Sequence, residues 1–236
     1  MIKAMFLAHL VGDYILQWNA LAAWKSRSQK GILMHGFIVL FVTWLFSLPF
    51  NPDWWRWALL IGVTHTVIDG LHLALAQRFN WVREGLWTQV RFVLDQLLHL
   101  AIIAFALMAS GYLSAGSLLL DVLSDLRSEP WLTYLLGYVF IMMPTWVIGK
   151  YLVYALVRGG APDFAAGANK YLGILERILI ITLIVLGQYI FVPLITVLHL
   201  RSQRREHDRL CARLYRAEVA TGILMAIIVG LGLRQL

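Results

Sequence analysis

The chain has 236 residues, of which 60% are hydrophobic and only 14% are charged. Soluble domains usually carry about 25% charged residues, so this composition excludes an ordinary soluble globular protein. Several windows of about 20 residues hold few or no charges, which is the length a helix needs to cross a bilayer core. The net charge of +7 indicates cytoplasmic loops and contacts with acidic lipid headgroups rather than with nucleic acid. The sequence therefore predicts an all-α, polytopic transmembrane bundle of about six or seven helices, with membrane lipids as partners and no nucleic acid.

Four apolar segments fill the first half of the chain, and each carries ionisable side chains. We expect helices at about residues 2–24, 31–49, 54–77 and 85–110. In the third, His65, Asp69 and His72 occupy positions i, i+4 and i+7, so they share one face. The other segments carry, in chain order, His9, Asp13 and Gln17, then His35, then Asp95, Gln96 and His99. Ionisable groups inside an apolar helix are costly and call for compensation.

The depths of these groups can be compared at 1.5 Å per residue, counted from the side of the basic turns. Asp13, Asp69 and Asp95 then share one layer, roughly 12–17 Å deep. His72 and His35 are expected nearer to the basic side, and His9, His65 and His99 somewhat deeper. The cations expected to ring the mouth are Lys25, Arg27, Lys30, Arg78, Arg83 and Arg91. The pattern predicts one site, provided that the four helix faces converge.

The second half of the chain alternates charged connections with apolar segments. We divide the sequence into a region 1–110, with the His/Asp cluster, and a region 111–236. Residues 111–130 form an acidic connection with a short interfacial helix at 118–126. Apolar segments follow at 131–157, where Pro144 predicts a kink or a re-entrant turn, at 171–200 and at 217–233. An arginine-rich loop is expected at 201–216. If the segments 131–157 and 171–200 both cross, this loop lies opposite the basic turns, against the positive-inside rule, unless the first of them is re-entrant.

Imidazole and carboxylate groups together suit a divalent metal such as zinc, iron or manganese. A metal ion would also neutralise several aspartates at once. The expected metal ligands are His9, Asp13, His65, Asp69, Asp95 and His99, and the expected catalytic groups are Asp69, Asp13, Asp95 and His72. Further candidates are His35, Gln17, Gln96, Glu176, Arg177 and Gln188. Of these, the two glutamines of the first half would support the ligands, and Glu176 and Arg177 would form an internal ion pair or an interfacial anchor.

Three functions fit this pattern. The first is a metal-dependent hydrolase that attacks a lipid-like or amphiphilic substrate within the membrane. The second is a proton or metal-ion transporter or channel that uses the same residues and needs a polar exit on the far side. The third is a non-catalytic membrane subunit whose polar network holds the bundle together. The sequence alone leaves open whether the protein is an enzyme.

An ordered series of short motifs resembles a known family. It runs Ala8-His9-Leu-Val-Gly12-Asp13-Tyr-Ile-Leu-Gln17, Met34-His35, His65-x-x-Ile68-Asp69 and Leu94-Asp95-Gln96-Leu-Leu-His99. This series resembles the bacterial membrane proteins of the domain of unknown function 3307 family. The later residues Gly173-Ile-Leu-Glu176-Arg177 and Gly187-Gln188 are similar to the C-terminal half of that family. The resemblance implies a multi-pass protein of the bacterial inner (cytoplasmic) membrane and implies no reaction. The arginine-rich loop departs from the family pattern.

Overall fold

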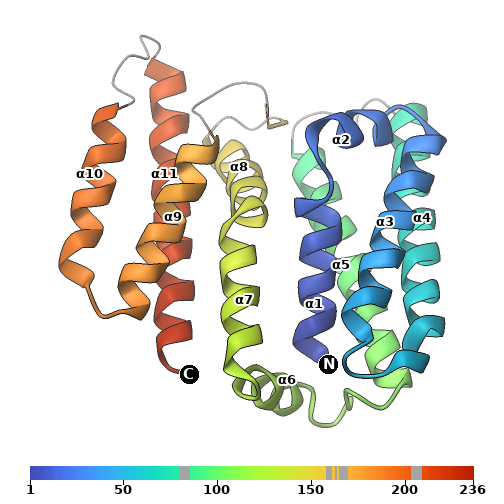
Figure 1. The fold of residues 1–236 in the computed structure, drawn as a ribbon. Helices are drawn as coiled ribbons and strands as arrows, with labels where there is room; N and C mark the ends of the chain where they lie inside the picture. Colours follow the sequence, from blue (N-terminus) through green and yellow to red (C-terminus); the bar gives the residue numbers. More distant parts are fainter. Residues whose placement is uncertain (80–85, 158–160, 163, 165–169, 203–208) are drawn as a thin grey trace. The chain divides into compact units, whose positions relative to one another are not determined.

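The structure, a computed structural model, is all-α (Figure 1). It describes every residue except 80–85, 158–160, 163, 165–169 and 203–208. Contacts divide the chain into two compact units, Met1–Leu136 and Gly137–Leu236.

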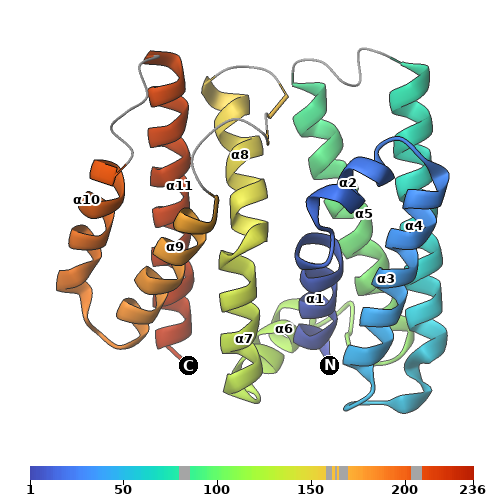
Figure 2. The same ribbon diagram turned by 45° about the horizontal axis from the view of Figure 1, so that its top comes forward.

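The first unit is a helical bundle closed at one end by a short helix. It comprises α1 (Ile2–Leu10), the π-helical turn η1 (Val11–Ile15), α2 (Asn19–Lys25), α3 (Gln29–Ser47), η2 (Pro52–Trp54), α4 (Trp55–Arg78), α5 (Trp87–Ala109), α6 (Leu118–Arg127) and the start of α7 (Pro130–Ile141). Helices α1, α3, α4 and α5 run side by side (Figures 1 and 2). The short α2 lies across one end of this bundle, and α6 packs against α1 at the other end.

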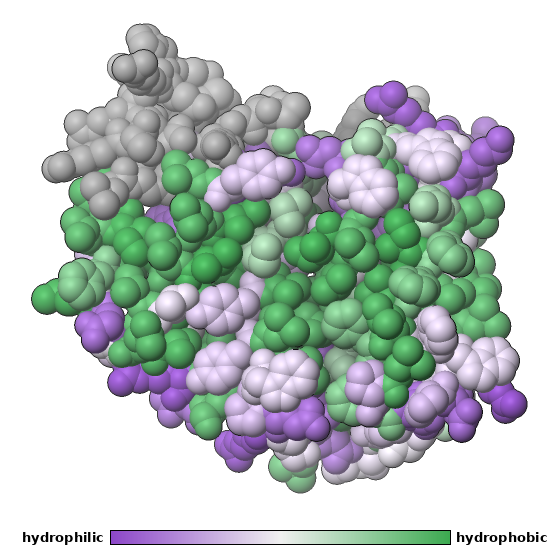
Figure 3. All heavy atoms as spheres, viewed as in Figure 1, coloured by the Kyte–Doolittle hydropathy of each residue, from purple (hydrophilic) through white to green (hydrophobic). Residues whose placement is uncertain are grey.

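Helix α4 shows that the polarity of this bundle is reversed relative to a soluble protein. Leu59, Val63 and Val67 follow one another at four-residue steps and are each about half exposed. On the opposite face, His65 and Asp69 are buried. Large contiguous apolar surface of this kind marks contact with a membrane or a partner. Figure 3 shows hydrophobic side chains along the helices, and hydrophilic ones gathered near both ends of the first unit.

The single helix expected at residues 2–24 is wrong. The chain forms α1, then the π turn, in which Leu16 N–H donates to Val11 O at 2.8 Å, and it leaves helical geometry before α2 begins. The turn lies against α3, where a Cβ on Gly12 would be 3.4 Å from Val39 Cγ2. Because a π turn adds a residue to the helical repeat, it changes which way the following side chains point. Asp13 therefore faces α3, and Gln17 does not continue the stripe of His9.

The second unit contains the end of α7 and the helices α8 (Met143–Val157), α9 (Lys170–Val185), η4 (Tyr189–Phe191), α10 (Val192–Ser202) and α11 (Arg209–Arg234). The break expected near Pro144 is confirmed, because α7 and α8 meet at a bend of 43°. The expected loop at 201–216 is wrong in part, since α11 starts at Arg209 rather than near residue 217. Arg204 and Arg205, like Arg83 of the first half, lie outside the described residues.

The apolar segment at 171–200 is a hairpin rather than one helix. Helix α9 ends at a turn in which Gly187 has φ +76°, a conformation that favours glycine, and α10 runs back beside α9 (Figures 1 and 2). The end of α10 therefore returns to the end of this unit at which α9 begins.

Four helices in the described residues are long and apolar enough to cross a membrane. These spans are Gln29–Ser47, Pro52–Arg78, Trp87–Ala109 and Arg213–Arg234, and the bent pair α7–α8 would make a fifth. The protein is thus a multi-pass membrane protein. The expected six or seven helices were too many, because the segments at 2–24 and 171–200 are each broken into shorter helices.

Candidate metal centre

Close packing of α3 against α4 brings two histidines together at the centre of the first unit. A Cβ on Gly62 of α4 would lie 2.5 Å from Leu40 Cβ, and one on Gly36 of α3 would collide with Thr66 Oγ1. The two glycines therefore let the helix backbones approach to a distance that larger residues would prevent. His35 and His65 lie within one turn of these glycines, and their Nε2 atoms are 3.1 Å apart.

Two carboxylates complete a compact set of four donor atoms. Asp13 Oδ1 lies 3.0 Å from His35 Nε2 and 3.8 Å from His65 Nε2. Asp69 Oδ2, one turn beyond His65 on α4, lies 3.4 Å from His65 Nε2 and 3.9 Å from His35 Nε2. All four residues are buried. The π turn, α3 and α4 thus direct two imidazole nitrogens and two carboxylate oxygens at one small volume.

These distances are close to those between the ligands of a tetrahedral metal site. Nitrogen and oxygen ligands bind Zn²⁺ at about 2.0–2.2 Å, which places tetrahedral ligands roughly 3.3–3.6 Å from one another. The five separations given above, from 3.0 to 3.9 Å, bracket this value. One candidate group of metal-binding residues is Asp13, His35 and His65, and another is His65, Asp69 and His99. The His/Asp cluster could therefore hold a metal ion.

Lys25 also reaches into this cluster, from the end of α2. Its Nζ lies 2.8 Å from Asp69 Oδ2 and 4.0 Å from Asp13 Oδ1, and it donates to Gln17 Oε1 at 3.1 Å. Burial opposes the charge of this ammonium, but the two carboxylates outweigh burial and raise the pKa of Lys25. The sequence placed Lys25 on the rim, and only the fold of α2 shows that it is part of the site.

A second group of polar side chains lies beside the four donors and is more exposed. His72 Nδ1 lies 2.6 Å from Asp95 Oδ1, and both side chains are about one-fifth exposed. Gln96 Nε2 donates to Asp95 Oδ2 at 3.0 Å and to Asp13 Oδ2 at 3.1 Å, so one amide links the two groups. Gln96 Oε1 accepts from Tyr14 OH at 2.7 Å. Tyr14 is therefore a further member of the site, one that the pattern of histidines and carboxylates does not indicate.

His9 and His99 form the deep side of the cluster. His9 Nε2 lies 3.3 Å from Gln96 Oε1, and the His99 ring stacks on that of His65 at 3.9 Å between centroids. In the described part of the chain, neither ring nitrogen of His99 has a hydrogen-bond partner, and its nearest carboxylate oxygen is Asp95 Oδ2 at 3.7 Å. His99 also belongs to a third candidate metal group, with Asp13 and Asp95. A buried imidazole without a partner is a further indication of a missing ligand.

The other three candidates lie in the second unit. Glu176 and Arg177 are buried on α9, and Gln188 is exposed in the turn that follows it. The guanidinium of Arg177 donates to the backbone carbonyls of Ile141 and Met142 rather than to Glu176. Glu176 also acts on this guanidinium electrostatically, so the internal ion pair or interfacial anchor expected of these two residues stays a prediction.

A comparison with protein families matched the part of the chain that contains the cluster. The profile described as "Protein of unknown function (DUF3307)" matches residues 1–126. The chain belongs to the DUF3307 family. The match to DUF3307 contains all the residues of the candidate metal centre. It ends before α9, so the similarity noted at residues 173–188 stays a prediction. Neither the curated proteins nor the solved structures gave a match to this chain.

Proposed function

We propose that the cluster binds a divalent metal ion and that the protein is a metal-dependent hydrolase acting on a lipid-like substrate. The observation that carries the proposal is the close approach of imidazole and carboxylate donor atoms, 3.0 to 3.9 Å apart, drawn from the π turn, α3 and α4. Their chemistry, imidazole with carboxylate, suits zinc, iron or manganese.

The charge of the cluster supports a divalent ion. Asp13, Asp69 and Asp95 contribute three negative charges, and Lys25 contributes one positive charge. With neutral histidines the cluster carries a charge of −2 in a bundle whose outer surface is apolar. Buried charge without compensation is costly. One divalent cation would balance the cluster.

The polar pair beside the four donors supplies the acid–base chemistry of a hydrolase. A bound metal would lower the pKa of a water molecule and make hydroxide available near neutral pH. Asp95, held by His72 and Gln96, is placed to accept a proton from that water. His72 would orient Asp95 and pass the proton on. The bonds open to attack are an ester, an amide or a phosphoester.

Access to the site supports an enzyme over a transporter. The side chains of Lys25, His72 and Asp95 are each 18–20% exposed, whereas those of His65 and His99 are 2% exposed. The cavity next to these histidines is lined otherwise by His9, Thr43, Thr64 and aliphatic side chains. A transport route needs a polar exit on that far side. The fall in side-chain exposure from Lys25, His72 and Asp95 to the two histidines supports a site that opens at one end only.

The substrate class follows from the surroundings of that entrance. Arg27, Lys30 and Arg78 lie at the end of the first unit that α2 closes, and Arg91 is near the start of α5 at the same end. Cationic side chains at a membrane surface attract acidic headgroups. A lipid or another amphiphile would reach the cluster from this rim, and membrane lipids are the expected partners.

The location that we propose is the bacterial inner membrane, with the rim on the cytoplasmic side. The basic turns support this orientation, because lysine and arginine are enriched in cytoplasmic loops. The hairpin α9–α10 supports the same orientation: if the bent pair α7–α8 crosses once, the arginine-rich segment would also be cytoplasmic.

Metal content of the purified protein tests the proposal. Wild type should hold about one metal ion per chain, and Asp69→Asn and His35→Gln should hold almost none. Asp53→Asn is the matched control, because Asp53 is an exposed carboxyl in a turn outside the cluster. Absence of bound metal from wild type after saturation with zinc, manganese and iron would overturn the metal site.

A second measurement separates hydrolysis from transport. Fluorogenic acyl esters and phosphodiesters in phosphatidylglycerol vesicles should be cleaved by wild type and not by Asp95→Asn. Metal-ion or proton flux into empty liposomes that is abolished by Asp95→Asn, without any cleavage, would instead establish the transporter.

A further inference from the structure

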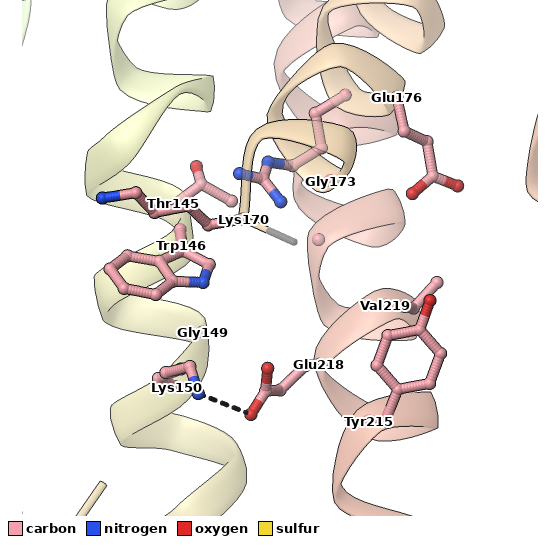
Figure 4. Close-up of a pocket in the computed structure, with 12 residues that line it drawn as sticks. Thr145, Trp146, Gly149, Lys150, Lys170, Gly173, Glu176, Tyr215, Glu218 and Val219 are labelled. Atoms are coloured by element: carbon pink, nitrogen blue, oxygen red, sulfur yellow. Dashed lines mark ion pairs between the residues drawn. The ribbon is translucent and has the colours of Figure 1, made fainter. Parts of the chain in front are cut away.

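A charged pocket lies in the second unit between α8, α9 and α11 (Figure 4). The residues of its lining that carry the argument are Trp146, Lys150, Lys170, Glu176, Arg177 and Glu218. Three cations and two carboxylates make the lining net positive. All of these side chains come from helices in apolar stretches, where charges are costly and usually functional.

Arg177 is the guanidinium of this lining and is buried on α9. It is 6% exposed, and its Nε and Nη2 donate to the carbonyls of Ile141 and Met142 at 2.8 and 3.0 Å. In the described part of the chain, the hydrogen bonds of the guanidinium use Nε and Nη2 and leave Nη1, and Glu176 acts on its charge. Gly173 and Gly222 leave room for the guanidinium, since a Cβ on either would be 3.3 Å from Nη1. Arg177 therefore holds a buried positive charge with one donor nitrogen to spare.

Of the two carboxylates of the lining, Glu176 acts on the charge of Arg177. Glu218 Oε1 lies 3.4 Å from Lys150 Nζ, so these two residues balance each other. Figure 4 shows the carboxylate of Glu176 directed away from Trp146. Lys170 Nζ lies over the Trp146 ring, 5.5 Å from its centroid. The Trp146 side of the pocket therefore carries the cations of Lys150 and Lys170.

We propose that this pocket binds a phosphate group, carried either by the head of a membrane lipid or by a soluble phosphate compound. A guanidinium is suited to phosphate, because its planar donors form strong charge-assisted hydrogen bonds with phosphate oxygens. Arg177 Nη1 is the primary donor and Lys170 the second cation. Because Arg177 is fixed by the carbonyls at the bend, the helix break between α7 and α8 positions the binding group. This site uses none of the residues of the metal centre.

Binding of two probes to the full-length protein in neutral detergent tests the inference. In the first arm, native mass spectrometry measures binding of dioleoyl phosphatidic acid, with dioleoylglycerol, which has the same acyl chains and no phosphate, as the weaker comparison. In the second arm, the shift of the unfolding temperature with inorganic phosphate is measured. Tight binding of phosphatidic acid without an effect of inorganic phosphate identifies a lipid head. A shift with inorganic phosphate that competes with lipid identifies a site for phosphate from either source.

Variants decide whether the binding is at this pocket. Arg177→Gln should weaken binding about tenfold or more, because it removes a charge-assisted hydrogen bond. Lys170→Gln, which removes a cation without disturbing the helix bend, should weaken binding about threefold to tenfold and decides the test if Arg177→Gln fails to fold. Arg213→Gln is the control, because Arg213 is exposed on α11 and does not line the pocket. Equal binding by Lys170→Gln and Arg213→Gln, or equal binding of the two lipids by wild type, would overturn the inference. Asp69→Asn should bind both probes normally whether or not the metal centre exists.

Discussion

Lys25 Nζ lies 2.8 Å from Asp69 Oδ2, so the cluster already contains one internal cation. This ammonium has two consequences. It reduces the negative charge that a metal ion must balance, and it occupies space beside one of the four proposed ligands. Protein stability and metal affinity are therefore both expected to depend on Lys25, which does not itself bind metal.

Replacement of Lys25 by methionine separates these two effects. Lys25→Met keeps the length of the side chain and removes its charge, which leaves Asp69 and Asp13 without their cation. In chelator, the variant should lose about 2–3 kcal/mol of stability, because breaking a buried ion pair strands the remaining charge. Added zinc should raise its unfolding temperature more than that of wild type. Thermal unfolding with and without zinc measures both effects.

Lys30→Met is the control for Lys25→Met, since Lys30 is an exposed cation at the start of α3. It should behave as wild type in chelator and in zinc. If Lys25→Met were as stable as Lys30→Met in chelator, Lys25 would not be a compensating charge of the cluster.

Ligands and acid–base groups should be distinguishable by mutation. Asp13→Asn and His35→Gln remove donors of the four-atom set, so metal content and activity should be lost together. His72→Gln and Asp95→Asn alter the exposed pair, so metal should stay bound while the rate of hydrolysis falls about 10²–10⁴-fold. Metal analysis and hydrolysis rates on the same preparations make the comparison. Loss of metal from His72→Gln would contradict this division of roles.

Much of this site follows from helical periodicity, but its centre does not. The spacing of His65 and Asp69 correctly places both on the inner face of α4. The count at 1.5 Å per residue fails for α1, because it assumes one uninterrupted helix. The π turn directs Asp13 toward His35, and α2 folds back to deliver Lys25. Both features depend on tertiary contacts, which periodicity does not contain.

Sequence reasoning also overestimated the number of crossings, for a similar reason. An apolar stretch looks the same whether it is one long helix or two shorter ones packed together. In the segment at 171–200, the difference lies in Gly187, whose positive φ reverses the chain. The bend near Pro144 was predictable because proline has a local effect on the helix that contains it.

The close approach of α3 and α4 gives a test that does not alter any polar group. Gly62→Ala adds a Cβ that would lie 2.5 Å from Leu40 Cβ. This distance is too short for two carbon atoms that are not bonded, so the helices must separate. Overpacking of this kind typically costs about 1–3 kcal/mol. Because separation also parts His35 from His65, metal affinity should fall as well. Unfolding temperature and metal titration measure the two losses.

Gly70→Ala on the same helix is the matched control. A Cβ on Gly70 would have only Gln29 Oε1 near it, at 3.9 Å, which is ordinary contact. Alanine favours a helix over glycine by about 1 kcal/mol, so this variant should be as stable as wild type or more stable. Equal effects of the two substitutions would show that the α3–α4 approach does not control the site.

Lys3 and Asp125 join α1 to α6 at the end of the first unit opposite α2. Asp125 Oδ1 and Oδ2 accept from the backbone N–H groups of Ile2 and Lys3, at 3.2 and 2.8 Å. In return, Lys3 Nζ donates to the carbonyl of Asp125 at 2.6 Å and to those of Ser128 and Glu129. Each residue therefore caps the helix of the other, and both caps depend on α1 and α6 staying docked.

Both caps require α1 and α6 to be packed together. The losses of stability caused by substituting Lys3 and Asp125 should therefore not be additive. Lys3→Met and Asp125→Ala should each lower stability by about 1–3 kcal/mol, since each leaves buried backbone groups unsatisfied. The double variant should lose clearly less than the sum, because either substitution alone undocks α6 and disables the other cap. Unfolding temperatures of the four proteins complete the cycle, with zinc content unchanged throughout because the metal donors lie on other elements. Additive losses would mean that the two caps act independently.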